Sequence, residues 1–151
     1  MASKAILQLN GFDDLLKAIE KAGGSIDKSA HSCITQAAHI MDDELKAQMQ
    51  AAGVDGNLIS SMPPPTIEAE GNRYRAAVGY KKVSYDPRNP SDGHKVVFLN
   101  YGTPRRTMHG QVAARGFIQK AKKKARPKIK KAQQETLDEI LRGLSNETKA
   151  N

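Results

Sequence analysis

Residues 117–144, FIQKAKKKARPKIKKAQQETLDEILRGL, form the longest candidate helix of the chain and largely decide its fold. Apolar and small residues recur along it at helical spacing: Ile118, Ala125, Ile129, Ala132, Thr136 and Ile140, widened late by Leu137, Leu141 and Leu144. Such a stripe is typical of an amphipathic helix that packs one face on a core. Pro127 has no backbone N–H, so we expect a kink or the start of a new helix there.

The positive charge of the chain is concentrated in the same region. The 151 residues carry 24 Lys+Arg and 16 Asp+Glu, a formal net charge of +8. Residues 104–131 hold 11 basic and no acidic side chains, whereas residues 1–103 hold 11 basic and 12 acidic ones. A local positive field attracts nucleic acid, an acidic protein surface or anionic lipid. The candidate contact residues are Arg105, Arg106, Lys120, Lys122, Lys123, Lys124, Lys128, Lys130 and Lys131.

Three interpretations of this basic segment remain open. It could bind phosphates without base readout, it could be a solvated helix face, or it could line a subunit interface or a channel for DNA. Phe117 is the only aromatic residue between 104 and 131, so stacking on bases is not indicated. No recognised nucleic-acid-binding motif accompanies the lysines.

The length favours a single domain over residues 1–151, with residues 1–10 and 145–151 as flexible ends. No apolar run approaches the roughly 20 residues that span a bilayer, and the first residues do not resemble a signal peptide. The single cysteine, Cys33, excludes an internal disulfide framework and a cysteine-cluster zinc site. It lies on an apolar helix stripe, where a buried, unreactive thiol is usual. These features predict a protein of a reducing cytoplasm.

The residues before the basic helix predict an α+β fold, with the C-terminal helix packed on a small antiparallel sheet. The predicted segments are a helix over 11–22, a longer helix over 26–52, a proline-rich connector over 53–65, a hairpin over 66–80 and a long loop over 81–94. Gly71 and Asn72 supply the turn of the hairpin. Residues 95–101, KVVFLNY, fit either a strand or a short buried helix, because periodicity does not separate the two.

The sequence contains no pattern that indicates catalysis. It lacks the nucleophile-elbow, zinc-protease, phosphate-loop and dinucleotide-binding motifs. His39 and Asp43 lie four residues apart and could share a metal ion, but a solvated helix surface is the favoured interpretation. Asp42, Asp43 and Glu44 are consecutive, so they fan around the helix and we expect them in solvent. We therefore predict a protein that is not an enzyme, with no catalytic, cofactor-binding or metal-binding residue.

Three short blocks follow one another along the chain. They are residues 53–62, GVDGNLISSM; residues 99–103, LNYGT; and residues 114–118, ARGFI. In this order the chain resembles the small neck or tail-completion proteins of long-tailed bacteriophages and prophages. The residues that carry the resemblance are Asp55, Gly56, Leu58, Ser61, Tyr101, Gly102, Thr103, Arg115 and Phe117.

The chain departs from the family pattern at several positions. The first block lacks the threonine of the family's D-T-G sequence. Asn100 stands where an acidic residue often precedes the aromatic-Gly-Thr turn, and Gly116 replaces the proline of A-R-P-F. The C-terminal helix is also unusually rich in lysine. These departures affect the expected turn geometry more than the resemblance itself.

The resemblance implies a structural virion protein without a cofactor, placed in the neck where the DNA-filled head joins the tail, and made in the bacterial host cytoplasm. It implies a homo-oligomeric ring that contacts adjacent phage connector and tail proteins and no membrane. The loop over 81–94 and the basic helix are then candidate subunit contacts, and the basic face could also meet packaged DNA. The alternative is a basic nucleic-acid-binding module without sequence-specific readout.

Overall fold

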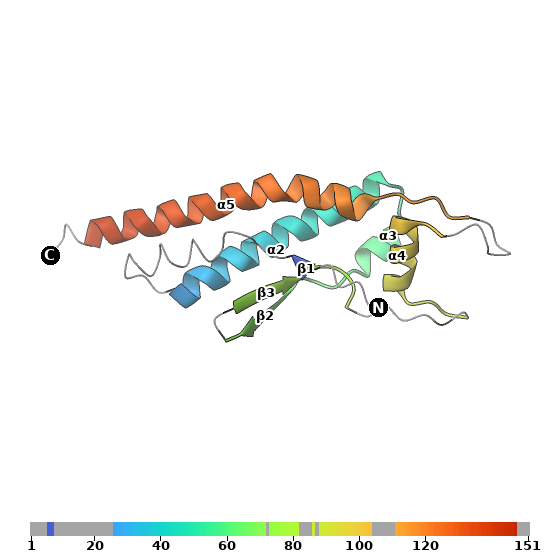
Figure 1. Cartoon of the computed structure of the whole chain (residues 1–151), viewed down its shortest axis with the longest axis horizontal. Helices are drawn as coiled ribbons and strands as arrows, with labels where there is room; N and C mark the ends of the chain where they lie inside the picture. The colour runs from blue at the N-terminus through green and yellow to red at the C-terminus, as the bar shows by residue number, and fades with distance from the viewer. Residues whose placement is uncertain are drawn as a thin grey trace.

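The α+β class is confirmed by the computed structural model, which describes residues 6–7, 26–71, 73–81, 86, 88–103 and 111–147 (Figure 1). The elements in chain order are β1 (Ile6–Leu7), α2 (Ile26–Ala51), α3 (Gly56–Ser60), β2 (Thr66–Glu70), β3 (Arg73–Ala77), α4 (Asp92–Tyr101) and α5 (Phe117–Glu147). The predicted helix over 11–22 lies outside the described residues. The predicted long helix over 26–52 is confirmed almost to the residue.

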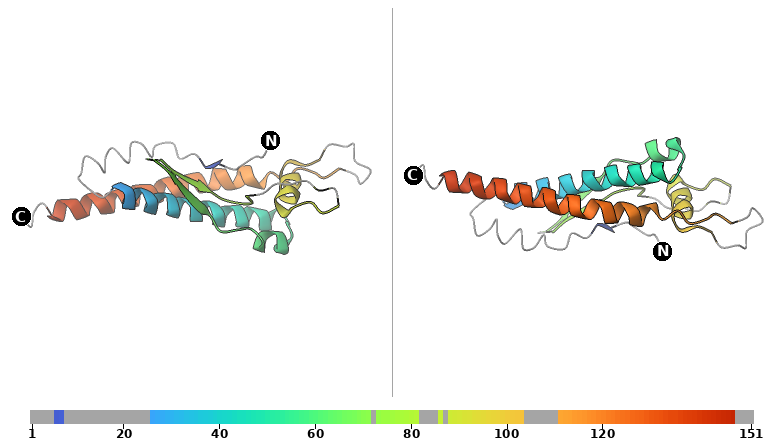
Figure 2. Two further views of the ribbon diagram at one scale, coloured as in Figure 1. Left: turned by 90° about the horizontal axis from the view of Figure 1, so that it is seen from below. Right: turned by 90° about the horizontal axis from the view of Figure 1, so that it is seen from above.

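The two long helices, α2 and α5, lie side by side in all views (Figures 1 and 2). The C-terminal helix therefore packs mainly on α2, and α2 in turn packs on β3, whereas the sequence placed the C-terminal helix on the sheet. Both helices bury small side chains, which allow two helices to approach closely. These side chains are Ala30, Ala37 and Ala38 on α2, and Ala121, Ala125 and Ala132 on α5.

The sheet has three antiparallel strands in the order β1, β3, β2. In the predicted hairpin, Thr66 lies opposite Ala77 and Glu70 lies opposite Arg73. Gly71 has a φ of +59° in the turn, a conformation that glycine adopts without steric cost. The predicted hairpin is confirmed, and Gly71 lies in its turn as predicted, whereas Asn72 lies outside the described residues.

The apolar segment that the sequence left open is a helix. Ser91 is the N-cap of α4, because its side chain accepts a hydrogen bond from the backbone N–H of His94 at 3.3 Å. Asp92 lies in the first turn, where the helix dipole favours a negative charge. The predicted loop over 81–94 therefore ends earlier than expected, at Ser91.

Helix α5 continues through Pro127 as one helix, so no new helix begins there. Both Pro127 and Lys123 are exposed. Water can therefore satisfy the Lys123 carbonyl oxygen, which loses its usual i+4 donor when that position is proline. The buried row of α5 begins one residue before the predicted stripe and comprises Phe117, Ala121, Ala125, Ile129 and Ala132.

Candidate functional site

The three blocks that carry the family resemblance meet at one end of the molecule, where α3, α4 and the beginning of α5 lie together (Figure 1). We call this region the motif junction and define it as residues 52–62, 80, 91–103 and 112–118. Its contacts join segments that are up to 63 residues apart in the chain.

Arg115 joins the third block to the first. Its Nη1 donates hydrogen bonds to the carbonyl oxygens of Ala52 at 3.0 Å and Gly53 at 2.9 Å, at the end of α2. The last carbonyls of a helix lack intrahelical donors, and a cation also complements the negative end of the helix dipole. The half-buried guanidinium thus fixes the end of α2 against the segment that enters α5.

Asn100 joins the second block to the third. It is only 1% exposed, and its Oδ1 accepts a hydrogen bond from the backbone N–H of Ile118 at 2.9 Å. Its Nδ2 donates to Gln119 Oε1 at 3.3 Å, and its carbonyl oxygen accepts from the N–H of Gly116 at 3.1 Å. Phe117 is fully buried beside it.

The turn formed by Tyr101, Gly102 and Thr103 packs on the segment before α5. Thr103 N–H donates to the carbonyl oxygen of Val112 at 3.0 Å, and Val112 N–H donates to Thr103 Oγ1 at 2.9 Å. Gly102 has a φ of +78°, and a Cβ there would lie 2.8 Å from the Val112 carbonyl oxygen and 3.0 Å from the backbone nitrogen of Ala114. Only glycine fits this position without displacement of the neighbouring backbone.

The first block is ordered by its own polar side chains. Asp55 caps α3, because its Oδ1 accepts from the N–H of Asn57 at 2.7 Å. Leu58 packs against the core, while Gly56 is exposed and has open space around it.

A second polar contact ties α3 to α4. Ser61 Oγ donates to Asp92 Oδ2 at 2.9 Å and lies 3.1 Å from Tyr80 Oη, and Tyr80 Oη donates to the Leu58 carbonyl oxygen. Hydrogen bonds from Lys95 and Ser61 lower the pKa of Asp92, and burial raises the pKa of Tyr80. These groups hold the two short helices together.

The predicted family residues therefore act mainly within the chain. Asp55, Ser61, Gly102, Thr103 and Arg115 each make contacts that order the junction. The junction also exposes large hydrophobic side chains, beside exposed polar residues such as Asp55, Asn57 and Lys95. Its large exposed side chains are Phe98 at 37%, Tyr101 at 54% and Val112 at 37%.

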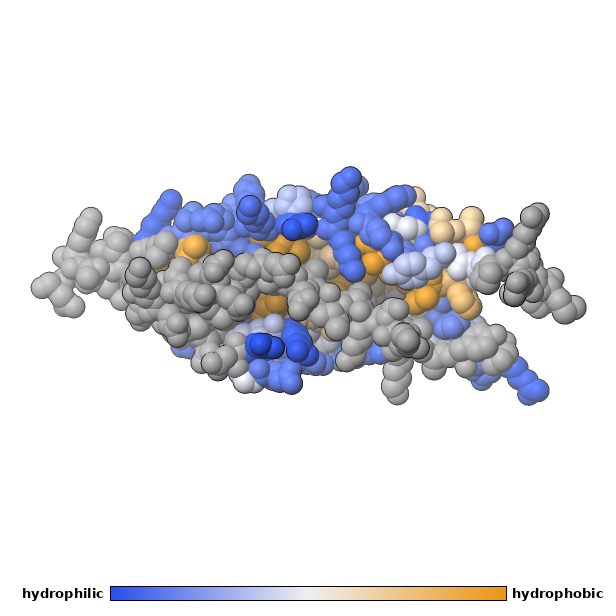
Figure 3. Space-filling view, viewed as in Figure 1, coloured by the Kyte–Doolittle hydropathy of each residue, from blue (hydrophilic) through white to orange (hydrophobic). Residues whose placement is uncertain are grey.

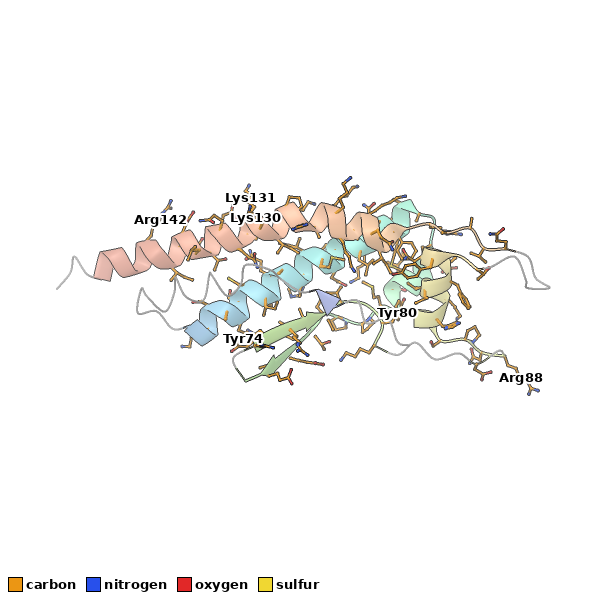
Figure 4. The ribbon with its side chains drawn as sticks, viewed as in Figure 1. Tyr74, Tyr80, Arg88, Lys130, Lys131 and Arg142 are labelled. Carbon is orange, nitrogen blue, oxygen red and sulfur yellow. The ribbon has the colours of Figure 1, made fainter. Side chains whose placement is uncertain are left out.

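The predicted basic residues of α5 are exposed along one helix (Figure 3). Lys130 and Lys131 point away from α2 in Figure 4, as does Arg142 further along. Lys128 forms an ion pair with Glu44 of α2, and Lys131 Nζ lies 3.7 Å from Glu135 Oε1. Arg105 and Arg106 lie outside the described residues.

Two of the acidic residues expected in solvent are buried, and that expectation was wrong. Asp42 is 5% exposed and pairs with Lys46 Nζ at 2.7 Å, while Glu44 is 9% exposed and pairs with Lys128. Both are on faces of α2 that are packed against the rest of the fold, and a cation compensates each carboxylate. Asp43 is exposed as expected.

The described residues contain no group of three or more His, Cys, Asp or Glu that could hold a metal ion. Cys33 is buried as predicted, and this burial raises the pKa of its thiol, against a smaller opposing effect of a hydrogen bond to Thr136. A shallow open groove on α2 is lined by residues that include Lys28, His31 and His39. Within the described part of the chain, no helix is long and apolar enough to cross a membrane.

Comparison with known proteins finds no match: no protein-family model, no curated protein and no solved structure is significantly similar to this chain.

Sequence reasoning missed Asn100 and Tyr80 as residues that order the motif junction, and Glu44 as the partner of Lys128 on α5. A polar residue inside the apolar run KVVFLNY is a usable signal for Asn100, since a buried amide needs partners. Glu44 and Lys128 are 84 residues apart, so no local pattern indicates their pairing.

Proposed function

We propose that this chain is a structural, non-enzymatic protein of the neck of a long-tailed phage, where it joins or completes the connection between head and tail as a homo-oligomeric ring. The observation that carries the proposal is the convergence of the three blocks. Arg115 contacts the first block, and Asn100 of the second block contacts the beginning of α5. Blocks that form one structural unit support the resemblance better than three separate similarities do.

In a ring, one surface of each subunit binds a different surface of the next subunit, so every subunit must offer the same two surfaces. The ring closes when the rotation between neighbouring subunits adds up to a full turn. The exposed Phe98, Tyr101 and Val112 are candidates for one of these surfaces. Interface centres are enriched in aromatic side chains and depleted in lysine, which favours this patch over the α5 face as a subunit contact. The further partners would be adjacent connector and tail proteins of the virion.

Electron microscopy of the negatively stained full chain, combined with analytical ultracentrifugation, tests the proposal. We expect closed rings with one copy number, and we expect Tyr101→Glu to shift the protein to monomers. Gln134→Glu, an equal charge change at an exposed position of α5, is the control and should leave the rings intact. A chain that stays monomeric at every concentration and binds no connector or tail protein would overturn the proposal.

A basic nucleic-acid-binding module is the second candidate function, and the row of exposed lysines on α5 favours it. The two functions differ in what neutralisation of Lys120 to Lys131 does. If the wild-type chain forms no ring and particles assemble without it, while the substituted protein loses DNA retention, the second candidate is favoured. If it retains DNA and particles no longer assemble, the neck function is favoured.

A further inference from the structure

We propose that the outer face of α5 binds the phosphate backbone of double-stranded DNA without reading its sequence. We define the outer face as the row Lys120, Lys123, Arg126 and Lys130. This inference names a partner for the proposed neck ring. It rests on the neck function only for the location of the bound duplex, which would be the channel of the ring.

The outer face lies opposite the row with which α5 packs on the fold. An α-helix has 3.6 residues per turn, so residues that are three or four positions apart lie on the same side. The buried row runs through Phe117, Ala121, Ala125 and Ile129, and all four residues of the outer face are exposed. A partner can therefore approach the outer face without displacing any packed residue.

The charges of the outer face are not neutralised within the described part of the chain. Residues 117–134 contain no Asp or Glu. Of the lysines on this part of α5, Lys128 pairs with Glu44 and Lys131 pairs with Glu135. The four outer-face residues form no ion pair with any described residue, so their counterions come from solvent and can be released on binding.

The spacing of unpaired charge on α5 is close to that of one strand of a DNA duplex. Residues 120–131 include eight basic side chains, of which six form no ion pair with a described residue. At a rise of 1.5 Å per residue the segment occupies about 17 Å of helix axis, which is roughly one unpaired charge per 3 Å. Each strand of the duplex carries one phosphate charge per about 3.4 Å of its axis. Flexible lysine stems let residues beside the outer face reach the same partner.

The side chains favour duplex DNA over other anionic partners. A helix that lies on a membrane inserts Trp, Phe or Leu, and the outer face has none of these. Binding of single strands relies on stacking aromatics, which are also absent from residues 120–131. Lysine is depleted from the centres of protein interfaces, so an acidic protein fits less well. Lysine contacts phosphate as a point charge, which explains binding without base readout.

Fluorescence anisotropy with the full chain and two roughly 30-base-pair duplexes of unrelated sequence tests the inference, with salt varied between about 50 and 200 mM. We expect equal affinity for both duplexes and a loss of about 100-fold over this salt range, as about four phosphate contacts require. The test variant replaces the outer face by glutamine at all four positions: Lys120→Gln, Lys123→Gln, Arg126→Gln and Lys130→Gln. The matched control removes four exposed charges elsewhere: Lys28→Gln, Arg73→Gln, Lys81→Gln and Arg88→Gln.

The expected result is that the outer-face variant loses nearly all of the salt-dependent binding, while the control loses less than about tenfold in affinity. Equal losses in the two variants would overturn the inference, because the binding would then follow net charge alone. Stronger binding to anionic phospholipid vesicles, or to a single strand of the same length, would also overturn it. Circular dichroism of both variants verifies that the helices are retained.

The same variants separate this inference from the neck function. If the wild type forms rings and the outer-face variant binds duplex unchanged, the inference fails and the neck function stands. If the wild type binds duplex through the outer face and forms no ring, the neck function fails and the binding surface stands.

Discussion

Asn100 supplies the cap that helix α5 lacks locally, because its Oδ1 accepts the hydrogen bond of the Ile118 backbone N–H at 2.9 Å. The residue before α5 is Gly116, which has no side chain and a φ of +62°. The first N–H groups of a helix need acceptors from outside the helix, and here one comes from the end of α4. The position and direction of α5 therefore depend on a residue from another helix.

Asn100→Leu keeps the number and branching of the side-chain heavy atoms and removes the cap. The Ile118 N–H then stays buried without an acceptor, and we expect a loss of about 2 kcal/mol in the free energy of unfolding. Urea denaturation measures this loss. Gln119→Ala, which removes only the exposed partner of Asn100 Nδ2, should cost no more than about 0.5 kcal/mol. Equal losses of unfolding free energy in the two variants would show that the hydrogen bond to Ile118 contributes no more to stability than the bond to Gln119.

Arg115→Lys keeps the positive charge and removes the planar guanidinium group that bonds to the Ala52 and Gly53 carbonyl oxygens. A lysine places one compact ammonium where Arg115 Nη1 now reaches two carbonyl oxygens, so we expect a loss of about 1 kcal/mol, and about 2 kcal/mol for Arg115→Ala. Thermal or urea unfolding gives both values. Arg126→Ala removes an exposed arginine of α5 and should stay within about 0.5 kcal/mol of the wild type. An Arg115→Ala variant as stable as Arg126→Ala would contradict the assigned contact.

Gly102 and Gly71 allow backbone strain to be separated from steric exclusion. Both have positive φ, +78° and +59°, but a Cβ at Gly71 meets nothing within 4 Å whereas one at Gly102 meets the backbone of Val112 and Ala114. We expect Gly71→Ala to cost about 1 kcal/mol and Gly102→Ala about 3 kcal/mol or more. Unfolding by urea measures the difference. Similar costs at the two positions would mean that the turn relaxes away from residues 112–114.

The contact of Asp92 with Ser61 and Lys95 should weaken in acid. These hydrogen bonds lower the pKa of Asp92 in the folded protein below 3.8, so the unfolded chain binds its proton more tightly. The stability due to the charged carboxylate is then present above about pH 4 and is lost as the pH falls through the folded-state pKa. The thermal midpoint of the wild type should exceed that of Asp92→Asn near neutral pH, and the difference should shrink as the pH falls below 3.8.

Removal of a single donor gives an independent measure of the same contact. In Ser61→Ala the carboxylate of Asp92 keeps only Lys95, so its titration followed by carbon-13 NMR should move to higher pH. A titration that does not move, or moves to lower pH, would contradict the bond from Ser61.

Local sequence signals predicted the elements that depend on local chemistry. The hairpin follows from alternation around Gly71, and the long helix over 26–52 follows from its apolar period. The sequence also contains a signal for the helical state of α4, since Ser91 and Asp92 form an N-cap and an acidic first turn. The β-branched Val96 and Val97, however, make the same segment fit a strand.

Contacts between residues that are distant in the chain could not be predicted from local sequence signals. The packing of the C-terminal helix on α2 follows from small residues that are complementary on two helices, and an apolar stripe alone does not specify its partner. The burial of Glu44 depends on Lys128 in the same manner. At the site, the blocks indicated which residues matter, whereas their intramolecular roles, and the cap from Asn100, emerge only from tertiary structure.

The small side chains that α2 and α5 bury limit how the two helices can vary. On α5, Ala121 is fully buried and Ala125 is 1% exposed; on α2, Ala37 is 1% exposed and lies one turn from Cys33, whose thiol bonds to Thr136 of α5. A larger residue on one helix needs a smaller one on the other, and alanine can only be reduced to glycine, at a cost to the helix. Viable sequence changes along this contact are therefore coupled, and a lineage that diversifies its surface freely should keep both helices small where they touch.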